Sequence, residues 1–127
     1  MPSGDPFAYA ILRVVPRADR GEALNVAVVL FCRSADFLAM RWQLPRERLT
    51  TLDATLDIDA LDAQLRALDA IIGGDRAGGS VALQPPSERF HWLVAPASTI
   101  VVPGDVHTGI SDDPRQTLDE LFEKLVR

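Results

Sequence analysis

The strongest constraint on the fold of this chain is an almost uninterrupted apolar run from Leu24 to Cys32. In an extended strand, successive side chains point to opposite faces of the sheet. The two faces would carry two apolar sets, Val26, Val28, Leu30 and Cys32 on one and Ala27, Val29 and Phe31 on the other. A strand that is apolar on both faces is typical of the centre of a sheet covered on both sides. The run therefore predicts a central strand.

Two further strands are predicted next to this central one. Residues Phe7 to Val15 carry aromatic and β-branched side chains and end at Pro16, which cannot donate to a sheet ladder. After the central run, the short link Arg33 to Asp36 leads into Phe37 to Gln43, and a link of this length favours an antiparallel hairpin. We therefore expect a three-stranded meander.

The later part of the chain has helical signals. Apolar residues recur every three or four positions from Ile58 to Ile72, with Asp57 placed to cap the helix and Gly73-Gly74 to end it. A terminal helix is predicted after Asp113-Pro114, where a capping residue precedes proline at the first helical position. Shorter elements are also expected: a helix from Pro45 to Asp53, a loop from Asp75 to Gln84, a strand from Thr99 to Val102 and a polar loop from Gly104 to Gly109. For Arg89 to Val94 the pattern favours one or two helical turns, with a strand as the alternative.

Strands cluster early and helices late, without regular alternation, so we expect an α+β fold. Its small antiparallel sheet would contain the N-terminal meander plus one or two later strands, packed by two main amphipathic helices. The length of 127 residues, 47% of them hydrophobic, is enough for one core, which predicts a single domain over residues 1–127.

Composition narrows the class of protein. The formal net charge is −5 from 13 basic and 18 acidic residues, and the basic ones include a single lysine, Lys124. This balance disfavours a nucleic-acid partner. No apolar run approaches the roughly 20 residues of a membrane span, and the N-terminus lacks the pattern of a signal peptide, so we expect a cytoplasmic protein. Cys32 is the only cysteine, which rules out an internal disulfide. We expect no metal and no cofactor.

None of the strong catalytic or phosphate-binding motifs is present in the sequence. Polar residues instead stand beside the apolar strands: Arg13 within the first strand, and Arg20, Glu22 and Asn25 before the second. A charged side chain near a core needs a carboxylate, a carbonyl or a bound anion. One interpretation is a structural ion pair such as Arg13 with Glu22. The other is a binding site.

A second polar group follows later in the chain and contains Arg89, Thr99, His107 and Thr108. If the loop at His107 folds against the sheet, Arg13, Arg20, Arg89 and His107 would form a pocket for a phosphate or carboxylate. The planar fork of arginine suits such ligands because it binds two oxygens at once. The alternative is that His107 only orders its own loop.

Several segments resemble the bacterial domain of unknown function family 3037. They are Tyr9 to Arg13 with Val15-Pro16, Arg20-Gly21-Glu22, Asn25 to Phe31, Glu88 to Leu93 with Ala95-Pro96, Ser98-Thr99 and Val106 to Gly109. Ala27 stands where the family usually has glycine. The resemblance implies no activity, but it implies a small bacterial protein that is sometimes encoded beside kinases resembling the HipA toxin.

Two functions remain open from the sequence. The first is a non-catalytic protein-interaction or accessory module, with a HipA-like kinase as the partner implied by the resemblance and with the sheet edge and the Arg20 to Asn25 loop as its contact surface. The second is a phosphate-, nucleotide- or other anion-binding domain, which could be a small enzyme using an Arg/His pocket with Glu22 as general base. The sequence does not indicate the oligomeric state.

Overall fold

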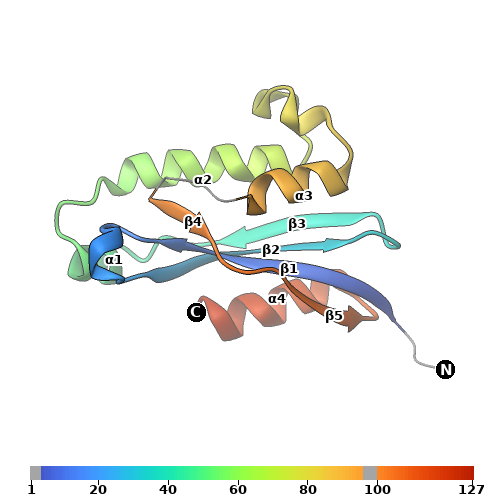
Figure 1. Cartoon of the computed structure of the whole chain (residues 1–127), viewed down its shortest axis with the longest axis horizontal. Helices are drawn as coiled ribbons and strands as arrows, with labels where there is room; N and C mark the ends of the chain where they lie inside the picture. The colour runs from blue at the N-terminus through green and yellow to red at the C-terminus, as the bar shows by residue number, and fades with distance from the viewer. Residues whose placement is uncertain (1–3, 96–99) are drawn as a thin grey trace.

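The central strand predicted from the apolar run lies in the middle of the sheet. A computed structural model describes residues 4–95 and 100–127, and in it strand β2 (Leu24–Cys32) pairs antiparallel with β1 (Asp5–Val14) and β3 (Phe37–Trp42). The other side of β1 pairs with two short strands, β4 (Val101–Pro103) and β5 (His107–Ser111). The predicted meander and the α+β class are therefore confirmed, with two later strands completing an antiparallel sheet (Figure 1).

Strand β5 corrects one sequence-based expectation. Residues Gly104 to Gly109 were predicted to form a polar loop, yet His107 begins a strand whose Cα atoms pair with β1 as far as Ser111. The reason is that β1 is ten residues long, and its second edge needs partners for its backbone N–H and C=O groups. That requirement outweighs the polar composition of the segment. The predicted strand from Thr99 overlaps β4, but Thr99 itself lies outside the described residues.

Helices occupy the expected places. They are α1 (Arg46–Leu52), α2 (Ile58–Ile72), α3 (Pro86–Val94) and α4 (Pro114–Leu125). The side chain of Asp57 accepts a hydrogen bond from the Ala60 amide at 3.0 Å, and that of Asp113 accepts one from the Gln116 amide at 3.2 Å, so both predicted N-caps are confirmed. Short 3-10 turns add η1 (Ala18–Arg20) between β1 and β2, and η2 (Arg76–Gly78) and η3 (Val81–Leu83) within the predicted loop.

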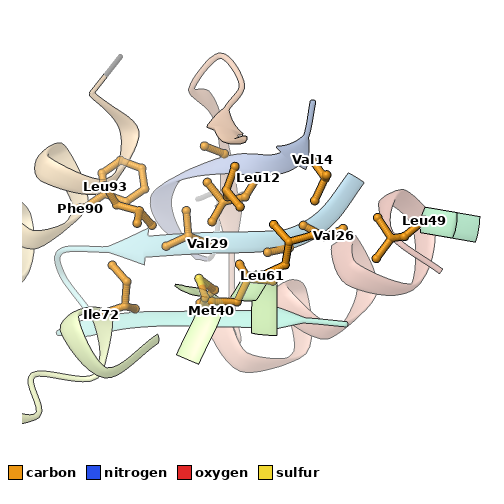
Figure 2. Packing of buried hydrophobic residues seen from close by; sticks show 14 of the residues in the cluster. Leu12, Val14, Val26, Val29, Met40, Leu49, Leu61, Ile72, Phe90 and Leu93 are labelled. Carbon is orange, nitrogen blue, oxygen red and sulfur yellow. The ribbon is translucent and has the colours of Figure 1, made fainter. Parts of the chain in front are cut away.

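Both faces of the sheet are covered, as the apolar run predicts. Figure 1 shows α2 and α3 over one face and α4 over the other. The first face contributes to a cluster that includes Leu12, Val29, Leu61 and Phe90 (Figure 2). The second face contributes to a cluster of Val28, Leu30, Cys32, Leu118, Phe122 and Val126. The sheet is thus the middle layer of three.

Val26 does not lie on the face that strict alternation predicts. It packs in the cluster beneath α2 and α3, together with Val29, instead of with Val28 (Figure 2). The pairing explains this: Leu12 pairs with Ala27, whereas the next residue, Arg13, pairs with Asn25. Val26 is therefore the extra residue of a β-bulge, which turns its side chain to the other face.

Aromatic rings hold β5 against β1. Gly109 pairs with Phe7, and a Cβ atom built on Gly109 would lie 2.6 Å from the Phe7 ring, so the ring lies directly over the glycine. Two pairs further along and on the same face, the ring of His107 packs against that of Tyr9 with 5.3 Å between centroids. Cross-strand contacts of this kind stabilise a sheet edge.

Replacing Gly109 with alanine tests this arrangement. We expect Gly109→Ala to lower the free energy of unfolding by about 1–3 kcal/mol, because the new methyl group overlaps the Phe7 ring. Urea unfolding measures the change. Gly104→Ala is the control, since its Cβ would meet the Ile11 carbonyl oxygen at an ordinary 3.4 Å. The cost should shrink in a Phe7→Leu background; an unchanged cost there would contradict the role given to the ring.

Candidate functional site

Asn25, one of the predicted site residues, has a structural partner. Its side-chain Nδ2 donates a hydrogen bond to the backbone carbonyl oxygen of Leu125 at 3.1 Å. Leu125 ends α4, where the last carbonyl groups of a helix have no partner within the helix. Asn25 therefore fastens the C-terminal end of α4 to the sheet.

Arg89 has a similar role at the end of α2. Its Nη1 donates to the carbonyl oxygen of Ile72 at 2.9 Å, and Ile72 is the last residue of that helix. Gly74 follows with φ of 73°, and a Cβ atom there would lie 2.6 Å from the same Nη1. A cation at a helix C-terminus also interacts favourably with the helix dipole. Arg89 thus joins α3 to α2 through a site that requires glycine.

The pocket expected from Arg13, Arg20, Arg89 and His107 does not form. His107 pairs with Tyr9, four residues along β1 from Arg13, which corresponds to roughly 13 Å. Arg89 lies on α3, on the face of the sheet opposite α4. The expectation failed because it placed His107 in a loop free to fold back, whereas β5 fixes this residue on the sheet.

The proposed ion pair of Arg13 with Glu22 is also replaced. Arg13 is exposed, and Glu22 pairs instead with Arg20, two residues before it. Gly21 between them has φ of 69°, a left-handed conformation that glycine adopts without strain. Arg41, by contrast, does find a structural partner, because its guanidinium lies 3.0 Å from the Asp119 carboxylate and 4.2 Å from the centre of the Phe122 ring.

Arg20 and Glu22 line a cavity between the β1–β2 connection and α1. Its volume is about 330 Å³. The lining residues are Pro16, Arg17, Arg20, Glu22, Thr51, Leu52 and Asp53. A second hollow of about 470 Å³ adjoins it and shares Glu22, Thr51 and Leu52 with it. Sequence patterns identified Arg20 and Glu22 but gave no sign of Asp53, which directly follows α1 and is brought here by the fold.

Asp53 is held in its charged form. Its Oδ1 accepts hydrogen bonds from the Thr55 hydroxyl at 2.6 Å and from the Thr55 amide at 2.8 Å. These bonds, with a smaller contribution from the Arg17 and Arg20 charges, lower the pKa of Asp53 below its ordinary value of 3.8. The cavity therefore combines two guanidinium groups with two carboxylate groups, counting Glu22.

The outer edge of β5 is a second candidate surface. Two large apolar side chains are exposed along it, Ile110 to 64% and Val106 to 46%. Thr108 is also exposed, and no described strand pairs with this side of β5. The sequence could not indicate this surface, because a segment expected to be a loop has no defined edge. Figure 1 places β5 and α1 at opposite ends of the sheet, so the two candidate surfaces are separate.

Two findings apply to the described residues as a whole. Within residues 4–95 and 100–127, no three His, Cys, Asp or Glu side chains gather so that they could hold a metal ion. Over the same residues, none of the helices is both long and apolar enough to span a bilayer.

The fold and these surfaces define an α+β protein with a three-layer arrangement and an open sheet edge. Residues 9–126 match the family described as protein of unknown function (DUF3037), and the chain belongs to that family. No curated protein and no solved structure matches the chain. The family resemblance inferred from the sequence motifs is confirmed.

The structural role of Arg89 can be measured directly. We expect Arg89→Ala to lower the free energy of unfolding by about 1–3 kcal/mol, because the Ile72 carbonyl loses a charged donor. Arg76→Ala, which removes an exposed arginine from η2, should change it by less than about 0.5 kcal/mol. Equal stabilities of the two variants would contradict a structural role for Arg89 and return it to the candidate binding residues.

Proposed function

We propose that this chain is a non-catalytic protein-interaction module that binds an extended segment of another protein along the outer edge of β5. The observation that carries the proposal is an exposed strand edge flanked by the apolar side chains of Val106 and Ile110. Strand addition uses such edges, because the backbone N–H and C=O groups supply affinity and alternate side chains supply specificity.

The composition of β5 supports this use of its edge. Soluble proteins usually protect edge strands with charged residues, proline or bulges. The residues of β5 are His-Thr-Gly-Ile-Ser, with no proline and no Asp, Glu, Lys or Arg. By contrast, β4 contains Pro103, and β3 at the opposite edge contains Arg41. β5 is thus the least protected of these edge strands.

The ring contacts between β1 and β5 also support the proposal. The Phe7 and Tyr9 rings hold the strand against β1, so its outer edge is formed before any partner arrives. A preformed edge reduces the ordering cost of association. The burial of Cys32 fits a non-catalytic module. It is the one cysteine of the sequence, and its side chain is fully buried and so inaccessible as a nucleophile.

Substitution of Ile110 tests the proposal. We expect Ile110→Lys to abolish capture of the partner from native lysate, with a HipA-like kinase as the first protein to look for. Leu83→Lys is the matched control, because Leu83 on η3 is also 64% exposed. In the purified complex, the amides of Thr108 and Ile110 should exchange more slowly with deuterium. Binding that survives Ile110→Lys but is lost in Arg20→Ala would move the contact surface to the Arg20 to Asn25 loop.

A specific observation favours a second candidate function, the binding of a small anion in the cavity next to α1. Arg17 and Arg20 both line this cavity. Arg20 contacts Glu22 through Nε. Within the described residues, no hydrogen bond engages its two terminal nitrogens, so both are available to an oxyanion. Because Glu22 and Asp53 also face this cavity, we expect weak binding of an anion that carries a small charge.

Inorganic phosphate is the probe for this second function. Titration into ¹⁵N-labelled protein should shift the amides of Arg20 and Gly21 with a millimolar Kd. Arg20→Gln should remove the effect, while Arg76→Gln, on an exposed turn elsewhere, should leave it unchanged. Shifts that persist in Arg20→Gln would exclude this cavity as the anion site.

A further inference from the structure

We infer that the segment bound by β5 is uncharged and apolar at alternate positions in its middle, and basic at both ends. This inference rests on the proposed function and specifies the partner of the same surface. It follows from the charges that flank β5, the direction of its side chains and the geometry of pairing with a second copy.

Acidic residues stand at both ends of β5. Asp105 comes two residues before the strand begins, and Asp112 and Asp113 follow directly after it ends. Asp105 and Asp112 are exposed, and neither forms an ion pair with a residue in the described part of the chain. Asp113 caps α4 through its side chain. The strand edge is therefore neutral in its middle and negative at both ends.

Neighbouring charges do not cancel these carboxylates. Asp5 pairs with Ser111 on the inner side of β5 and adds a further negative charge at the same end. The nearest arginine or lysine in the sequence, Arg115, lies with its guanidinium 5.0 Å from the centre of the Phe37 ring, and Phe37 belongs to β3 at the other edge of the sheet. A partner with basic ends would meet unpaired negative charge.

The side chains of β5 alternate between two environments. His107, Gly109 and Ser111 share a face with their pairing partners on β1, which are Tyr9, Phe7 and Asp5. Thr108 and Ile110 point to the opposite face. There, Ile110 is 64% exposed and offers apolar surface to a strand laid alongside. Because cross-strand neighbours share a face, the added strand should carry apolar residues at every second position.

A second copy of the chain fits this edge poorly. Antiparallel pairing of two β5 strands with full overlap places Gly109 opposite Gly109. In that register Asp105 of one copy lies opposite Asp113 of the other, whose neighbour in the chain is Asp112. By symmetry, the same three carboxylates meet at the other end of the interface. Like charges directly opposite each other destabilise a sheet. The charge pattern that opposes self-pairing is the one that favours a basic-ended partner.

Two synthetic peptides test the inference. Both are blocked at their termini and eight residues long, the number of residues from 105 to 112. Their sequences, KTVTITVK and ETVTITVE, differ at the ends alone. We expect the lysine-ended peptide to shift the amides of Thr108 and Ile110 in ¹⁵N-labelled protein with a Kd about tenfold lower than that of the other peptide. The ratio should fall toward one in 1 M NaCl, where the charges are screened.

Variants assign the effect to the flanking carboxylates. The double variant Asp105→Asn/Asp112→Asn should bring the Kd values of the two peptides closer together, while Asp5 and Asp113 remain in place. Glu47→Gln is the control and should keep the tenfold ratio, because it removes a carboxylate from α1 at the opposite end of the sheet (Figure 1). Ile110→Lys should weaken both peptides and thereby confirm that each binds at β5.

The outcomes separate this inference from the proposed function. Equal binding of both peptides to the unmodified chain at low salt would overturn the basic-ended partner and leave strand addition at β5 intact. Failure of both peptides to shift the β5 amides at millimolar concentration would overturn strand addition as well. A chain that is dimeric in solution and becomes monomeric on Ile110→Lys would show that a second copy occupies the edge, which also overturns the inference.

Discussion

The two-sided burial of β2 is the constraint on which the rest of the structure depends. Its residues from Val26 to Leu30 are completely inaccessible to solvent. Burial of an aliphatic side chain of this size contributes about 1.5–3 kcal/mol relative to exposure, so both faces of the strand must be covered for the sheet to form. One helical layer cannot meet this demand. The chain meets it by sending α2 and α3 to one face and returning α4 to the other.

The three-layer arrangement creates a second requirement at the sheet edges. Two short strands, β4 and β5, pair with the outer side of β1. β5 has few side chains that could hold it there by packing. Gly109 permits the Phe7 ring to lie over the backbone, and His107 stacks on Tyr9. Gly109 and the candidate binding residue His107 thus hold an edge strand in place. The consequence is a strand that is held on one side by β1 while its other edge remains exposed, and the proposed strand addition depends on that edge.

The fold could be predicted largely from local signals, whereas the candidate surfaces could not. Apolar runs, Asp57, Asp113 and the short link before Phe37 determine elements through nearby residues alone, and the structure contains each of them. The predictions for Val26 and for the segment that forms β5 were wrong because both depend on β1. The bulge at Val26 arises where Arg13 pairs with Asn25, and β5 forms because the second edge of β1 is open. Arg20 and Glu22 could be singled out, but Asp53 becomes their neighbour through α1.

The placement of the motif residues also bears on how the two candidate surfaces can act. Asn25 and Arg89 each donate a hydrogen bond to a helix-terminal carbonyl group, so both side chains have a structural role in the fold. Arg20 and Glu22 pair with each other and line a cavity, at the end of the sheet opposite β5. Substitutions at sites this far apart usually have additive effects. A ligand in the cavity and a strand at β5 could therefore be bound at the same time.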